Sequence, residues 1–192
     1  MPIFSLEFHN ILFYLISFFW IIEIFVFRPQ YKGFNYINNP SFKTIIIVIL
    51  TIILGTLLYN HFGLFVLPDY SFIYFNYIGI FIYTIGLGLR YYTRFTLRRH
   101  FTREIKVYSS QRLISDGPYR LFSHPLYLGL FLLLLAVPVY FGQVIWILAT
   151  ILFFGKVILN KMKEEERVLK ESHKDTYTSW LKKRYRFIPW IF

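Results

Sequence analysis

Four long apolar stretches, at residues 5–27, 44–67, 72–89 and 125–155, are the strongest pattern in the chain. The last three contain no Asp, Glu, Lys or Arg. A helix needs roughly 20 consecutive apolar residues to cross a bilayer, so the pattern predicts an all-α, multi-pass membrane protein. The first stretch is too long for a signal-peptide core and shows no small-residue cleavage site, so we expect it to remain as a helix.

The fourth stretch has 31 residues, which is too long for one untilted crossing and about right for two short ones. Pro138 and the residues 141–143 (Phe-Gly-Gln) offer a turn between them. We therefore predict five transmembrane helices, with the last two as a helical hairpin, followed by a cytosolic C-terminal helix.

Basic residues test this count, because cytosolic loops carry an excess of Lys and Arg. Residues 28–43 hold three, residues 90–120 hold eight, residues 161–186 hold nine, and Lys156 completes the 21 in the chain. Five crossings place all of them on one side, whereas a single kinked helix at 125–155 would send the nine-charge tail outside. The expected topology thus has the N-terminus outside and the C-terminus in the cytosol, in a bacterial inner membrane or the endoplasmic reticulum.

Composition agrees with one integral membrane domain over residues 1–192, in which residues 1–88 form the N-terminal helices. Of the 192 residues 56% are hydrophobic and only 16% are charged, less than a solvated surface usually requires. The net charge of +11 is explained by the membrane topology and by anionic lipid, so no nucleic-acid partner is expected. The chain has no Cys, and His9, His61, His100 and His173 are scattered, so no metal site is proposed.

Two cytosolic segments are not explained by membrane crossing. In the first, Asp116, Gly117 and Pro118 predict a turn, and Pro125 suits the first turn of the fourth helix. His124 then lies at the helix start, where free N–H groups can hold a carboxylate or phosphate. An ordinary helix-end histidine is the simpler alternative.

The second segment, residues 161–180, has the spacing of an amphipathic helix whose apolar face is bordered by Glu165 and Glu166. Acids beside a buried face need a partner or a ligand. A surface helix stabilised by pairs such as Glu166 with Lys170 is the competing interpretation. Glu23, inside the first apolar run, is expected to pair with a cation such as Arg28 or to reach the cytosolic edge.

In sequence order, residues 117–129, the hydrophobic hairpin and residues 165–169 resemble the isoprenylcysteine carboxyl methyltransferase family and the related phospholipid methyltransferases. The family pattern is Gly-x-Tyr, Arg-His-Pro-x-Tyr, Glu-Glu-x-x-Leu, Tyr-x-x-Tyr and a terminal Pro. Tyr177, Tyr185 and Pro189 match the last elements loosely. The resemblance covers about residues 89–189, which we therefore expect to contain the cofactor-binding catalytic region, 89–192.

The resemblance implies an S-adenosylmethionine-dependent methyltransferase that acts at the cytosolic membrane face on a lipidic or hydrophobic acceptor, such as an isoprenylcysteine carboxylate. Residue by residue, it implies catalytic roles for Lys161 and Glu165. The cofactor-binding residues it implies are Gln111, Arg112, Leu113, Ile114, Gly117, Tyr119, His124, Pro125, Leu126, Tyr127, Glu165 and Glu166.

Three departures from the family pattern bear on the acceptor. Ser123 stands where Arg usually precedes His-Pro, Lys161 stands where Arg is usual, and His173–Lys174 replace a common Phe-Gly. Two alternatives remain open: an NADPH-dependent membrane oxidoreductase of the sterol-reductase type, which the segment 185–192 also resembles, and a non-catalytic membrane protein of the same fold.

Overall fold

Helices account for nearly all of the described chain in the computed structural model, which describes residues 7–26, 40–62, 69–101 and 113–186. The element order is α1 (Phe8–Val26), α2 (Pro40–His61), α3 (Asp69–Phe101), the short 3₁₀ helix η2 (Gly117–Arg120), α4 (Pro125–Tyr140), α5 (Val144–Ala149), the π-helical turn η3 (Thr150–Phe154) and α6 (Gly155–Leu181). The prediction of an all-α protein is confirmed for these residues, which form no strand beyond one isolated bridge.

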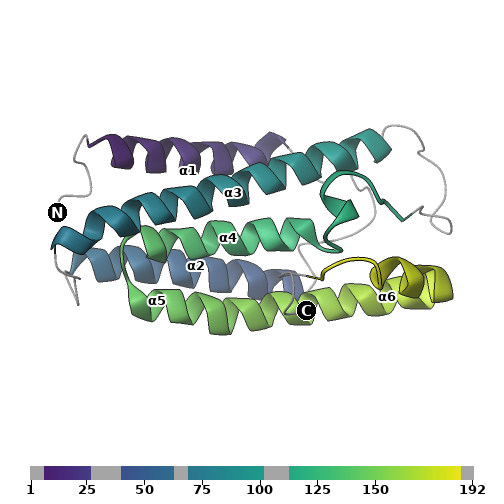
Figure 1. Cartoon of the computed structure of the whole chain (residues 1–192). Helices are drawn as coiled ribbons and strands as arrows, with labels where there is room; N and C mark the ends of the chain where they lie inside the picture. Colours follow the sequence, from purple (N-terminus) through teal and green to yellow (C-terminus); the bar gives the residue numbers. More distant parts are fainter. Residues whose placement is uncertain (1–6, 27–39, 63–68, 102–112, 187–192) are drawn as a thin grey trace.

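Successive helices run in opposite directions along one axis, with α5, η3 and α6 forming a continuous last pass (Figure 1). Three segments are long and apolar enough to span a membrane: Lys43–His61, Ile73–Leu97 and Val144–Glu171. Two shorter apolar helices, Phe8–Glu23 and Pro125–Tyr140, accompany them. Three of the described segments can therefore span a membrane, while the count of five crossings stays a prediction.

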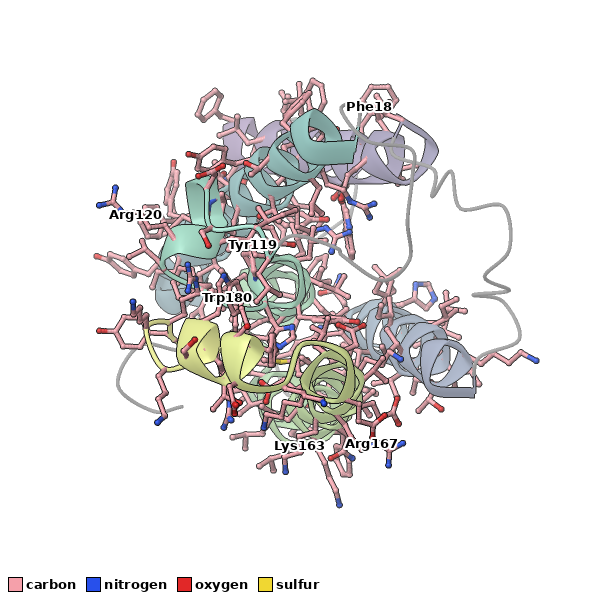
Figure 2. All side chains as sticks on the ribbon, turned by 90° about the vertical axis from the view of Figure 1, so that its right-hand side faces the viewer. Phe18, Tyr119, Arg120, Lys163, Arg167 and Trp180 are labelled. Atoms are coloured by element: carbon pink, nitrogen blue, oxygen red, sulfur yellow. The ribbon has the colours of Figure 1, made fainter. Side chains whose placement is uncertain are left out.

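Helix α4 lies at the centre of the bundle (Figure 2). Helices α1 and α3 lie on one side of it, and α2 and α6 lie around its remaining sides. Leu133, Leu134 and Ala136 are fully buried in it. The outward faces of the surrounding helices instead carry exposed Phe, Ile and Leu side chains, such as Phe18. An apolar outer surface around a buried apolar helix is what a lipid environment allows, because the hydrocarbon is as apolar as the core.

Glycines let α3 and α4 approach closely. A Cβ added to Gly79 would lie 2.6 Å from Cα of Tyr140, and one added to Gly86 would lie 3.0 Å from N of Leu133. Gly86 thus allows close packing of α3 on α4, whereas Gly88 faces open space. Small residues are the usual means by which membrane helices bring their backbones together.

Two helices extend beyond the limits that hydropathy indicated. Helix α3 continues through residue 89 to Phe101, because Arg90 and Arg94 find partners inside the bundle. The expected C-terminal helix is not a separate element, because α6 continues the last apolar pass to Lys174. There the backbone turns (φ 44°, ψ −122°) and the final helical residues fold back along α6 (Figure 1).

Candidate functional site

The start of α4 forms one wall of the candidate site. Pro125 is the first residue of the helix and His124 precedes it, as the sequence predicted. Both are buried. The carbonyl oxygen of His124 accepts hydrogen bonds from the backbone N–H groups of Tyr127 (3.1 Å) and Leu128 (3.2 Å), so the imidazole is held at the helix entrance.

The acidic pair of α6 faces this helix start. The Tyr127 hydroxyl donates to Oε1 of Glu165 (2.5 Å). The two ring nitrogens of His124 face both acids: Nδ1 lies 3.9 Å from Oε2 of Glu165 and Nε2 lies 3.5 Å from Oε1 of Glu166. Glu166 is buried and Glu165 is half-exposed. Two segments about 40 residues apart in sequence are thus brought together, which an ordinary solvent-facing surface helix would not require.

The chain after α6 returns to cover the turn before α4. Its backbone pairs there like a short parallel strand: Ser123 N–H donates to the Tyr185 carbonyl (2.8 Å), and Tyr185 N–H donates to the Leu121 carbonyl (2.9 Å). This pairing brings Arg186 Nε to 3.1 Å from Oε1 of Glu166. The buried carboxylate therefore has a cation on one side and an imidazole on the other.

A second set of contacts fixes Tyr119 in η2. Arg184 donates from Nε to the Tyr119 carbonyl and from a terminal nitrogen to the Trp180 carbonyl (2.6 Å each), and its guanidinium lies 4.1 Å from the Trp180 ring centre. Trp180 Nε1 donates to Ser115 Oγ (3.0 Å). The end of α6 and the segment 115–119 are therefore one packed unit, and Tyr119 and Trp180 are both labelled in Figure 2.

Gly117 makes the turn into η2 possible. Its φ of +57° is a conformation that favours glycine, and an added Cβ would lie 2.6 Å from Thr96 Oγ1 on α3. The predicted turn at Asp116–Pro118 is present, and it packs η2 against the C-terminal part of α3.

Two buried polar atoms at the site form no hydrogen bond within the described part of the chain: the Tyr177 hydroxyl, and His124 Nε2, which has the 3.5 Å ion-pair contact with Glu166 but no hydrogen bond. Tyr177 is stacked on Trp180, with ring centres 5.7 Å apart. The pKa of Tyr177 is raised mainly by burial and, to a smaller extent, by the negative charge of Glu166. The pKa of Tyr119 is raised in the same way by burial and by the charge of Glu165. Both phenols thus stay protonated hydrogen-bond donors at neutral pH.

The remaining residues predicted for the site divide into three groups. Leu113 and Ile114 are half-buried just before Ser115. Lys161 lies one turn before Glu165 on α6, where its ammonium pairs with Glu164 (3.3 Å). Gln111 and Arg112 lie outside the described residues.

Sequence reasoning missed Arg184 and Arg186 as parts of the site. Their signal was a dense basic and aromatic cluster after residue 179, which the positive-inside rule had already explained. Glu166 and Arg186 also border a surface hollow lined further by Lys163, Arg167, Lys170 and Glu171. Lys163 and Arg167 point outward from α6 in Figure 2.

The model of the isoprenylcysteine carboxyl methyltransferase (ICMT) family matches residues 77–171, about half of the chain, from α3 to the acidic turn of α6. The chain belongs to this family. Family membership implies a membrane methyltransferase, in agreement with the spanning helices. Among curated proteins, none matches the chain at a significant level. The matched region holds His124, Tyr127, Glu165 and Glu166, but it ends before Arg186.

Proposed function

We propose that the protein is an S-adenosylmethionine-dependent methyltransferase that acts at the cytosolic membrane face on a lipidic or hydrophobic acceptor. The observation that carries the proposal is the meeting of the α4 start with the acidic turn of α6, around the Tyr177 hydroxyl and His124 Nε2, two buried polar atoms that form no hydrogen bond with any described residue. Leaving such atoms unsatisfied costs roughly 1–3 kcal/mol each, so a ligand that pairs with them recovers that free energy.

The chemistry of these side chains fits the cofactor. When bound, S-adenosylmethionine supplies a methyl group activated by its sulfonium. Glu165 and Glu166 offer carboxylate oxygens to hydroxyl or amino groups, the Tyr177 hydroxyl offers a donor, and His124 at the helix start suits a carboxylate. The faces of Tyr119 and Tyr127 suit a cation, at about 1–2 kcal/mol each when desolvated.

Displacement of the methyl group requires that donor and acceptor are held in line, more than it requires proton transfer. A carboxylate or thiolate acceptor arrives already ionised, so His124 is assigned to binding rather than to general base. Holding two reactants in line supplies several kcal/mol by itself. Tyr127 contributes to this alignment, because its hydroxyl ties α4 to Glu165 of α6.

The acceptor is proposed to enter laterally between helices, with its polar head near Lys161. Lys161 lies where the apolar pass of α6 gives way to its charged part, so it can meet an anionic head at the level of the lipid headgroups. Lysine offers a point charge rather than the planar fork of arginine, so it grips a carboxylate less selectively. The proposal predicts that detergent-free bilayers raise activity toward prenylated acceptors. Bilayer-dependent activity that is seen only with fully water-soluble acceptors would contradict lateral entry.

A binding titration tests the cofactor. Purified protein in lipid nanodiscs is titrated with S-adenosylmethionine, S-adenosylhomocysteine and NADPH, and the heat of binding is measured. We expect binding of the first two, and about a tenfold or larger loss of affinity in Glu165→Ala and His124→Ala, because each removes a hydrogen bond to a charged group. Glu171→Ala is the matched control, since this acid is exposed on the same helix.

The outcomes of that titration separate the alternatives. Selective binding of NADPH would replace the methyltransferase proposal with an oxidoreductase. No binding of any of the three would indicate a protein that kept the fold without the chemistry. An equal loss of affinity in Glu171→Ala would show that the acids act through general charge rather than through the site.

The orientation in the membrane has a direct test, because the chain contains no Cys. Single cysteines are introduced at exposed Val144, at the start of α5, and at exposed Ser179, near the end of α6. In inside-out vesicles a membrane-impermeant maleimide should label the Ser179 variant and not the Val144 variant. Labelling of both would contradict the proposed cytosolic face.

A further inference from the structure

A buried ion cluster joins α1 to the candidate site. Glu23 of α1 is fully buried, and it accepts hydrogen bonds from Arg90 Nε (2.7 Å) and Arg94 Nε (3.0 Å) of α3. Arg28, the partner expected from sequence, lies outside the described residues. An ionised side chain inside a bundle persists only when it is paired, and in membrane helices it marks a functional place by default.

Arg90 reaches beyond this cluster to α4. One of its terminal nitrogens donates to the Leu126 carbonyl (3.2 Å), inside the first turn of α4. The stem of Arg90 crosses α4 at Gly129, where an added Cβ would lie 2.5 Å from Arg90 Cγ. A side chain at position 129 would block this path, so Gly129 makes room for the arginine.

The geometry points to Arg90 as a positioning residue: oriented by Glu23, it fixes the first turn of α4 and thereby places His124 and Tyr127 against Glu165 and Glu166. Leu126 lies between the two residues that face the acids, so holding its carbonyl restrains both. This inference rests on the proposed function only for its effect on ligand affinity. Its effect on the helix start is independent of any ligand.

Arginine is required here because its fork makes two hydrogen bonds in different directions. Nε of Arg90 donates to the Glu23 carboxylate, and a terminal nitrogen donates to the Leu126 carbonyl. A lysine at position 90 offers one ammonium nitrogen in place of the two guanidinium nitrogens that bond these acceptors. Helix α1 thus becomes part of the scaffold of the site, although no residue of α1 was predicted to belong to it.

The opposite end of α4 provides a matched control. Asn76 of α3 donates from Nδ2 to the Tyr140 carbonyl (2.8 Å), which is the same kind of contact between the same two helices. Asn76→Leu therefore breaks an α3–α4 contact of similar type far from the acidic pair. Arg90→Met removes the charge but keeps an unbranched stem over Gly129, and Glu23 keeps Arg94 as its partner.

Two measurements test the inference. Hydrogen–deuterium exchange of the ligand-free protein should quicken at residues 126–130 in Arg90→Met, and at the far end of α4 in Asn76→Leu. Affinity for S-adenosylhomocysteine should fall about tenfold in Arg90→Met and less in Arg90→Lys, as expected for one lost charged hydrogen bond. It should stay within about twofold in Asn76→Leu, whose contact lies away from the site.

Unchanged exchange at residues 126–130 in Arg90→Met would overturn the inference, whatever the ligand data show. Equal losses of affinity in Arg90→Met and Asn76→Leu would also overturn it, because general loosening of the bundle would then explain both. If the wild-type protein binds no S-adenosylhomocysteine, the proposed function fails, and the exchange pattern alone decides the role of Arg90.

Discussion

The two ends of α4 are held in different ways. At the end near Tyr140 the contacts are neutral: Asn76 donates to the Tyr140 carbonyl, the Tyr140 hydroxyl to Asn10, and Gln143 Nε2 to the Thr56 carbonyl (3.1 Å). The Tyr140 ring also stacks on Phe13, with ring centres 4.1 Å apart.

The end near His124 is held by charged groups instead. Glu165, Glu166, Arg186 and Arg90 surround the first turn of α4. Both ends contain buried polar atoms without a hydrogen bond in the described part of the chain, but at the end near Tyr140 no charged group is among the contacts just named, and Gln143 bonds through its other amide atom. Ionic groups kept close together suit ligand binding, whereas neutral contacts suit helix packing. The following predictions test that contrast, from the largest expected effect to the smallest.

The largest effect is expected for Glu23→Gln, which leaves Arg90 and Arg94 beside a neutral amide. Removing one partner of a buried ion pair costs about 3–5 kcal/mol, so the unfolding temperature should fall strongly. Tryptophan fluorescence during heating measures it in detergent micelles. The control Glu7→Gln removes an exposed acid (54% exposed) and should cost under about 0.5 kcal/mol. Similar losses in both variants would show that Glu23 is not an essential partner.

The same substitution at two turns compares the ends of α4 directly. Gly117 (φ +57°) and Gly142 (φ +62°) both favour glycine, so alanine should destabilise each by about 1 kcal/mol. Gly117→Ala should cost about 1 kcal/mol more, through its clash with Thr96, and should weaken S-adenosylhomocysteine binding by moving Tyr119. Weakened binding in Gly142→Ala would remove the distinction between the two ends.

Removing one hydroxyl separates binding from stability. Tyr177→Phe deletes a buried hydroxyl that forms no hydrogen bond with the described residues, so stability should hold or rise while ligand affinity falls several-fold. Tyr83→Phe deletes a hydroxyl bonded to Ser17 (3.0 Å), so it should cost about 1 kcal/mol and leave affinity unchanged. Calorimetric titration and thermal unfolding check both variants. Wild-type affinity in Tyr177→Phe would place the ligand away from this hydroxyl.

The smallest expected effect is a gain in stability, at position 174. Lys174 occupies a conformation (φ 44°) that favours glycine, the residue common at this position in the family pattern. Lys174→Gly should therefore raise stability by about 1 kcal/mol. Thr176→Gly, at an exposed helical position two residues later, should lower it by up to about 1 kcal/mol. A loss of stability in Lys174→Gly would show that the turn at 174 is not strained.

Local sequence patterns predicted much of the fold. Hydropathy indicated the helices, Pro125 marked the start of α4, and residues 141–143 marked its end. The family motif identified His124, Tyr127 and Glu165 before any contact between them was known. These signals are local because membrane helices satisfy their own backbone groups, so apolar length alone predicts them.

Hydropathy misled at Arg90, where the apolar run stops and α3 does not. It also could not separate Glu165 from Glu166, although Glu166 is the more buried acid and contacts both His124 and Arg186. A charged residue in a sequence is usually assigned to a solvent-exposed position unless its partner is known. The partners of Arg90 and Glu166 lie 20 or more residues away along the chain.

The amino-acid sequence by itself determined the family, the helical class and the residue types that the proposed chemistry needs. Only the tertiary structure decided which charged groups meet: Glu23 with Arg90 and Arg94, and Glu166 with His124 and Arg186. The physical reason is that helix formation depends on neighbours within a few residues, whereas pairing of buried charges depends on which helices pack together.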